Sequence, residues 1–170
     1  MKYLTLIRHA KSSWDFADLD DMVRPLNQRG KEATTLMGHY IKSLKIKPDV
    51  MISSPATRAL HTALNIASWL GINKARIDID KSIYFGGTKA MVEKLSSLDS
   101  LPSAPDEVFL FGHEPYMSEL VHKLTGDEIE KFPTCAFYRI ALDAATWSEA
   151  MKIQGTKDIF VSPKMLMNKS

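Results

Sequence analysis

Short apolar runs alternate along the chain with longer stretches of helical periodicity, and this alternation restricts the fold more than any other feature. Apolar and β-branched residues at 3–7, 50–52 and 107–111 are typical of strands buried in a sheet. Between the first two runs, apolar residues recur every three or four positions from residue 28 to about 44. This order predicts an α/β protein, which we expect to be a three-layer α/β/α sandwich around a mostly parallel central sheet.

The remaining elements follow from the same rules. We expect further helices over residues 55–70, 88–98 and 116–124 and further strands over residues 76–79, 135–142 and 158–161. Pro55 is predicted in the first turn of its helix, Thr88 as an N-cap, and Cys135 as a small buried residue within a strand. The basic segment 164–170 is predicted to be a mobile end.

Size and composition suit one ordinary globular domain. The 170 residues are enough for a full hydrophobic core, so we expect a single domain over residues 1–170. A net charge of +2 is too small to imply a nucleic-acid or membrane partner. The only cysteine, Cys135, excludes an internal disulfide, and no apolar stretch is long enough to span a membrane. We therefore expect a cytoplasmic protein.

Cationic and imidazole side chains follow three of the predicted strands. Arg8 and His9 end the first strand, Arg58 lies just after the second, and His113 follows the run at 107–111. If these strands are parallel, their carboxyl ends meet at one edge of the sheet, where α/β proteins bind ligands. Two arginines, two histidines and the amides of helix N-termini favour a tetrahedral anion such as phosphate.

These residues stand in motifs that resemble a known family. Arg8-His9-Ala10 resembles the Arg-His-Gly signature of the histidine phosphatase superfamily, which includes the cofactor-dependent phosphoglycerate mutases. The sequences at 54–62 and 112–113 resemble its second and third motifs, in the expected order. More narrowly, the segments 8–14, 21–30 and 112–115 resemble the short SixA-type phosphohistidine phosphatases.

The resemblance implies a phosphatase in which His9 is the nucleophile that takes the phosphoryl group. It implies that Arg8, Arg58 and His113 hold the phosphate oxygens, and that inorganic phosphate is the product. The chemistry agrees, because neighbouring cations favour the neutral imidazole and stabilise charge on the transferring group. No metal and no cofactor are expected, since no clustered carboxylates suggest a metal site.

Two departures from the superfamily pattern matter. Ala10 replaces a glycine, which reduces backbone freedom there. The acidic residue that usually protonates a leaving alcohol has no counterpart at 81–87, and the elements predicted over 63–111 leave no room for a cap domain. An imidazole leaves with less need of an acid than an alkoxide does. Phosphohistidine on a protein is therefore the expected substrate, presented to an open site.

Two carboxylates remain candidates for site support. Asp21 is predicted to form a structural ion pair or cap around Arg24 and Pro25, and Glu114 to be a favourable charge at a helix N-terminus. If either reaches the phosphate, small-molecule phosphate esters become plausible substrates. A non-catalytic phosphate-binding module is a third hypothesis, and mutase activity the least favoured, because no cap is available to retain an intermediate.

Overall fold

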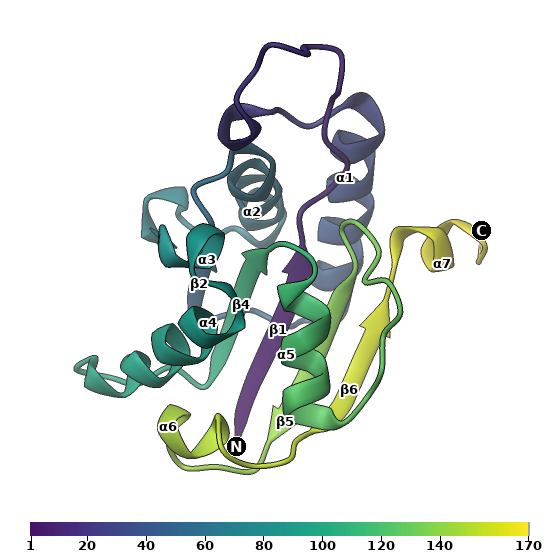
Figure 1. The fold of residues 1–170 in the computed structure, drawn as a ribbon. Helices are drawn as coiled ribbons and strands as arrows, with labels where there is room; N and C mark the ends of the chain where they lie inside the picture. The colour runs from purple at the N-terminus through teal and green to yellow at the C-terminus, as the bar shows by residue number, and fades with distance from the viewer. Residues whose placement is uncertain (170) are drawn as a thin grey trace.

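The computed structural model describes residues 1–169, which form a six-stranded sheet between two layers of helices (Figure 1). The strand order is β3-β2-β4-β1-β5-β6. The strands are β1 (Lys2–Arg8), β2 (Val50–Ser53), β3 (Ile77–Ile79), β4 (Glu107–Gly112), β5 (Phe137–Leu142) and β6 (Thr156–Val161). The first four in spatial order are parallel, and β5 is antiparallel to both of its neighbours, β1 and β6. The predicted α/β sandwich with a mostly parallel sheet is confirmed.

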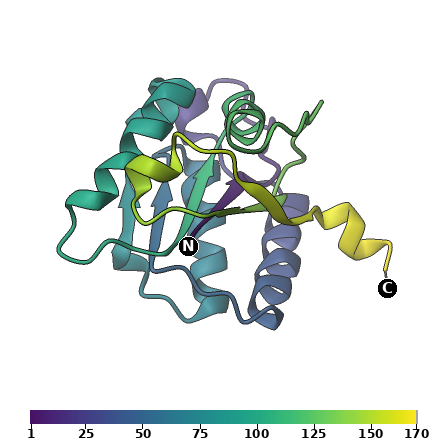
Figure 2. The same cartoon turned by 90° about the horizontal axis from the view of Figure 1, so that it is seen from below.

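Helices cover both faces of the sheet. The helices are α1 (Gln28–Ser43), α2 (Thr57–Leu70), α3 (Ser82–Phe85), α4 (Gly87–Ser96), α5 (Tyr116–Thr125), α6 (Trp147–Ala150) and α7 (Pro163–Met167). Seen from below, α1 and α2 lie on one side of the sheet and α4 and α5 on the other (Figure 2). None of the described helices is both long enough and apolar enough to cross a membrane.

The two layers enclose two hydrophobic clusters. Successive side chains of a strand point to opposite faces, so Leu4 and Leu6 of β1 pack into one cluster and Ile7 into the other. Leu6 and Ile7 are fully inaccessible to solvent. Because β1 is buried on both faces, the residues that follow it start from a fixed position.

Four local predictions need correction. Pro55 lies one residue before the N-cap of α2, Ala56, rather than in the first turn. Thr88 is not an N-cap, because the unpredicted helix α3 leads directly into α4, and the Thr88 hydroxyl donates to Glu119 instead. Cys135 is buried but lies in the turn before β5, with φ 59°. The mobile end predicted for 164–170 is wrong for residues 164–167, which form α7, while Ser170 lies outside the described residues.

The sheet topology places three strand ends side by side. Arg8 of β1 pairs with Gly112 of β4, and Ser53 of β2 pairs with Phe111 of β4. The residues that follow these strands therefore share one edge, as the sequence predicted. The connection between β2 and β4 is filled by α2, β3, α3 and α4, and no separate cap domain is present among residues 1–169.

We predict that Gly38→Val destabilises the fold through the contact of α1 with α2. A Cβ at Gly38 lies 2.6 Å from the Trp69 ring, so a branched side chain must displace the indole. We expect a loss of about 2 kcal/mol in the free energy of unfolding, measured by urea denaturation. Thr35→Val, on an exposed part of the same helix, is the control. Equal stability of the two variants contradicts the prediction.

Candidate active site

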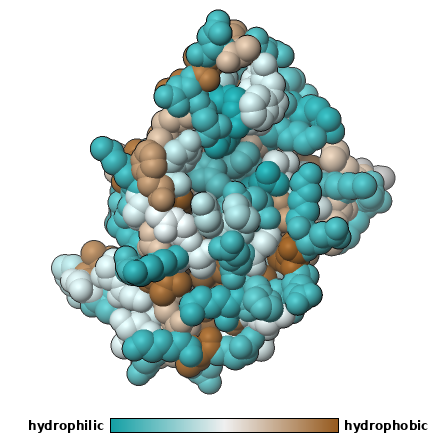
Figure 3. All heavy atoms as spheres, in the orientation of Figure 1, coloured by the Kyte–Doolittle hydropathy of each residue, from teal (hydrophilic) through white to brown (hydrophobic). Residues whose placement is uncertain are grey.

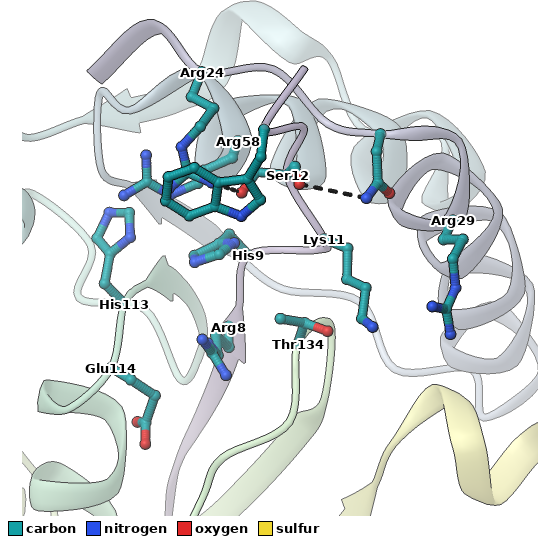
Figure 4. Close-up of a pocket in the computed structure, with 12 residues that line it drawn as sticks. Arg8, His9, Lys11, Ser12, Arg24, Arg29, Arg58, His113, Glu114 and Thr134 are labelled. Carbon is teal, nitrogen blue, oxygen red and sulfur yellow. Dashed lines mark hydrogen bonds between the residues drawn. The ribbon is translucent and has the colours of Figure 1, made fainter. Parts of the chain in front are cut away.

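A cavity of about 420 Å³ opens at the carboxyl edge of the sheet. Hydrophilic side chains gather over this part of the molecule, at the top of Figure 3. The cavity is lined by Arg8, His9, Lys11, Ser12, Trp14, Arg24, Asn27, Arg29, Arg58, His113, Glu114 and Thr134. The structure thus brings together the four groups that the sequence placed at one edge, namely Arg8, His9, Arg58 and His113 (Figure 4).

Hydrogen bonds fix the backbone that carries His9. The His9 amide donates to the Gly112 carbonyl at 3.1 Å, and the Ala10 amide donates to the Thr62 hydroxyl at 3.0 Å. The Cys135 amide donates to the carbonyls of Arg8 and His9. Ala10 is fully buried without a left-handed φ, so alanine needs none of the backbone freedom of glycine here. The strand end is held by β4, α2 and the turn before β5 together.

The same geometry sets the tautomer of His9. Its Nδ1 lies 2.8 Å from the Ala10 carbonyl oxygen, which can only accept, so Nδ1 carries the proton and Nε2 keeps its lone pair. Burial lowers the pKa of His9 to about 3, against the opposing effect of the Ala10 hydrogen bond and with smaller contributions from His113, Arg58 and Arg8. His9 is therefore neutral and nucleophilic at physiological pH.

His113 faces His9 with ring centroids 5.3 Å apart. Its Nε2 lies 2.8 Å from the Ser54 hydroxyl, and the oxygen of that hydroxyl accepts a hydrogen bond from the Ala56 amide at the start of α2. Burial, followed by the charge of Arg58, lowers the pKa of His113 to about 4. Its Nδ1 is buried and has no hydrogen-bond partner among the described residues.

Each arginine of the site donates hydrogen bonds through some of its N–H groups, while its Nε–H group has no acceptor among the described residues. Arg8 Nη1 donates to the Phe132 carbonyl at 2.7 Å. Arg58 donates through Nη1 to the Asp21 carbonyl at 2.7 Å and through Nη2 to Asp21 Oδ2 at 2.9 Å. The Nε–H groups of Arg8, Arg24 and Arg58 are buried without an acceptor among residues 1–169. The guanidinium groups of all three arginines line the cavity, and such groups match the oxygens of an oxyanion.

Asp21 connects three elements beneath this cationic group. Its carboxylate accepts from Arg24 at 3.0 Å, from Arg58 at 2.9 Å and from the Tyr84 hydroxyl at 2.6 Å. The hydrogen bond from Tyr84, followed by those of the two arginines, holds the pKa of Asp21 well below its usual range. The predicted pair with Arg24 is present, and Asp21 also holds Arg58.

Glu114 is the only carboxylate among the described residues that line the cavity. Its oxygens accept from the amide and hydroxyl of Ser118 at 2.9 and 2.6 Å, and from the Phe132 amide at 3.3 Å. The predicted position at a helix N-terminus is therefore observed. These three hydrogen bonds hold the Glu114 carboxylate as an acceptor.

Some residues of the site escaped sequence reasoning. Arg24 donates to Ser12, and its guanidinium carbon lies 3.8 Å from the ring centroid of Trp14, which is 78% exposed. Arg24 could have been found, because it stands in the Arg-Pro-Leu segment of the SixA-like motif. Tyr84 could not, because it reaches Asp21 from helix α3, in a segment that gave no helical signal.

Comparison with known proteins identifies the family. Residues 4–83 match the model of the histidine phosphatase superfamily (branch 1). The chain is 31% identical over 159 residues to an uncharacterized chloroplastic protein of Arabidopsis thaliana, covering 89% of this chain and 72% of that protein. It is 26% identical over 139 residues to the phosphohistidine phosphatase SixA of Escherichia coli (strain K12), covering 81% and 84%. The chain belongs to the histidine phosphatase superfamily.

Solved structures of other phosphatases share the fold. The protein histidine phosphatase SixA complexed with tungstate superposes with a TM-score of 0.81 at 24% identity, covering 96% of this chain and 99% of the other. A mycobacterial glucosyl-3-phosphoglycerate phosphatase gives 0.71 at 12% identity, covering 95% and 99%. This histidine phosphatase is a hydrolase of phosphorylated compounds. Among its described residues no group of three or more His, Cys, Asp or Glu side chains forms a metal-binding cluster.

We predict that Asp21→Asn weakens the binding of inorganic phosphate about 10-fold. Removing the charge lessens repulsion of the anion, but Asp21 is half exposed, so that gain is screened. The loss of charge-assisted bonds to Arg24 and Arg58 dominates, because both guanidiniums are then free to reorient. Isothermal titration calorimetry measures the affinity, with Asp18→Asn as an equally charged control in the same loop. Unchanged or tighter binding by Asp21→Asn refutes the positioning role.

A second prediction concerns stability against pH. The folded-state pKa values of His9 and His113 lie below the ordinary value of about 6.5. The unfolded chain therefore binds more protons as the pH falls from 6.5 towards 4, and the folded state loses stability in that window. Each histidine lowers the free energy of unfolding by up to about 1.4 kcal/mol for each unit by which the pH falls in this window. The double variant His9→Asn/His113→Gln should show a shallower decline in urea denaturation. An equally steep decline means that other groups cause it.

Proposed function

We propose that this histidine phosphatase hydrolyses phosphohistidine on proteins through a covalent phosphoryl intermediate on His9. The observation that carries the proposal is a neutral His9, with its lone pair on Nε2, in a cavity bounded by Arg8, Arg58 and His113. Its substrate class is supported by the resemblance to SixA, a phosphohistidine phosphatase in Escherichia coli.

The first chemical step forms one bond and breaks one. The Nε2 lone pair of His9 attacks phosphorus, the N–P bond of the substrate breaks, and the leaving imidazole nitrogen keeps the bonding electrons and takes a proton from water. Because Nδ1 keeps its proton, phosphorylated His9 is a cationic ring, and the Ala10 carbonyl at 2.8 Å stabilises that charge. The phosphoryl oxygens are held by Arg8, Arg58 and His113. Stabilising the charge on these oxygens provides most of the catalysis of phosphoryl transfer.

The second step releases inorganic phosphate. A water molecule attacks phosphorus on the side opposite His9, the Nε2–P bond breaks, and its electrons return to Nε2. The cationic ring is a good leaving group, since it departs as the neutral Nδ1–H imidazole from which the cycle began. The proton of the attacking water passes to solvent or to phosphate, so the enzyme returns to its starting state.

The surroundings of the cavity favour phosphohistidine over an ordinary phosphate ester. An alkoxide needs a proton donor as it leaves, whereas an imidazole is far less basic. Glu114 is held as an acceptor by Ser118 and Phe132. Asp21 is held by Arg24, Arg58 and Tyr84, and its lowered pKa means that it is ionised. Because residues 1–169 include no cap domain, we expect a side chain presented by a folded protein to reach His9.

We predict that His9→Asn abolishes turnover and acid-labile labelling by phosphate. Asparagine keeps a polar side chain of similar size but has no nucleophilic lone pair on nitrogen. Incubation with a 32P-phosphohistidine protein followed by denaturing electrophoresis at alkaline pH measures the labelling, with His122→Asn, an exposed helical histidine, as the control. Retention of turnover by His9→Asn refutes the covalent mechanism.

Substrate preference is a separate prediction. We expect kcat/KM for a phosphohistidine protein to exceed that for sugar phosphates by about 100-fold or more, because the leaving imidazole needs no acid. Released phosphate measures both reactions with the same enzyme preparation. A preference for the sugar phosphates favours the small-ester phosphatase instead. Phosphate binding without turnover of any donor favours the non-catalytic module.

A further inference from the structure

A second, larger cavity of about 730 Å³ adjoins the catalytic cavity. The two share the side chains of Arg8, Lys11, Arg29 and Thr134, so they are immediate neighbours on the surface. In Figure 4, His113 lies to the left of Thr134, and Lys11 and Arg29 lie to its right. The yellow C-terminal segment passes on the same side as Lys11 and Arg29. The second cavity thus extends the site from the phosphate position towards α7.

Unpaired cations surround this second cavity. They come from four parts of the chain: Lys11 after β1, Arg29 in the first turn of α1, Lys131 before β5, and Lys164 in the first turn of α7. All four residues are exposed, and none forms an ion pair with any of the described residues. No carboxylate lines the cavity within the part of the chain that the structure describes. The cavity therefore has an uncompensated positive charge.

Apolar side chains also line this second cavity. Ala33, Pro133, Pro163 and Met167 form much of the wall. A sugar phosphate offers hydroxyl groups to such a wall and gains little, whereas a polypeptide brings aliphatic side chains together with its charges. Four separate cations also exceed what one small monophosphate can neutralise once its phosphoryl group is bound among Arg8, Arg58 and His113.

We propose that this second cavity is a docking groove for an acidic segment of the protein substrate, next to its phosphohistidine. The inference rests on the proposed function, since the phosphohistidine occupies the catalytic cavity and its flanking residues enter the groove. Asp or Glu side chains pair with Lys131 and Lys164, while the apolar side chains of the segment contact the proline-rich wall. Docking selects proteins by the charge beside their phosphohistidine and takes no part in the chemical steps.

The test uses two synthetic peptides of equal length, each with one central phosphohistidine. One carries Asp and Glu beside it, and the other carries Ser and Gln. For the acidic peptide, we expect Lys131→Gln/Lys164→Gln to raise KM about 5-fold with kcat unchanged. For the neutral peptide and for phosphoramidate, the double variant should match the wild type. Lys123→Gln/Lys152→Gln removes the same charge from exposed positions outside both cavities and should change nothing.

Binding of the unphosphorylated acidic peptide, followed by fluorescence anisotropy, tests the groove without catalysis. We expect Lys131→Gln/Lys164→Gln to weaken this binding, and added salt to weaken binding to the wild type. If the peptide binds in this way but no phosphohistidine is hydrolysed, the proposed function fails and the groove stands. If the wild type does not distinguish the two peptides, or if a sugar bisphosphate rather than the peptide depends on Lys131 and Lys164, the docking proposal is overturned.

Discussion

The hydrogen bond from His9 Nδ1 to the Ala10 carbonyl is the interaction on which this site depends. It fixes which nitrogen carries the proton, and so directs the lone pair of Nε2 away from the backbone. The bond in turn requires a fixed strand end, which the contacts of His9 and Ala10 with Gly112 and Thr62 supply. Local backbone geometry thus determines the chemical character of the imidazole before any ligand binds.

Positive charge is used in two ways around this imidazole. Arg24 and Arg58 are neutralised in part by Asp21, which holds them in place and limits the repulsion between them. Their Nε–H groups, like that of Arg8, remain without an acceptor in the described structure. Buried unpaired donors cost stability. The three arginines nevertheless line one cavity, where their guanidinium groups together favour an oxyanion.

The sequence predicted those parts of the fold that rest on local pattern. Strand β1, helix α1 and the convergence of Arg8, Arg58 and His113 followed from periodicity and from the parallel arrangement of buried strands. The helix α3 was missed, because its four residues are too few to show a period. The contact of Tyr84 with Asp21 was missed for a different reason, because it joins residues 63 positions apart and no local pattern relates them.

The second cavity, with its cationic lining, could not be predicted from the sequence either. Its cations lie in four separate segments, and the net charge of +2 gives no sign that they meet on one surface. Only the packing of α7 beside α1 and the turn before β5 brings them together. Charge patterning over a fold is therefore informative here where composition is not.

The protonation state of the His9 imidazole tests the account most directly. Nitrogen-15 NMR of histidine-labelled protein near pH 7, with His9→Asn used to assign the signals, distinguishes a protonated ring nitrogen from one with a free lone pair. The account predicts a neutral His9 with the proton on Nδ1 and a bare Nε2. A proton on Nε2, or a doubly protonated ring at that pH, contradicts it.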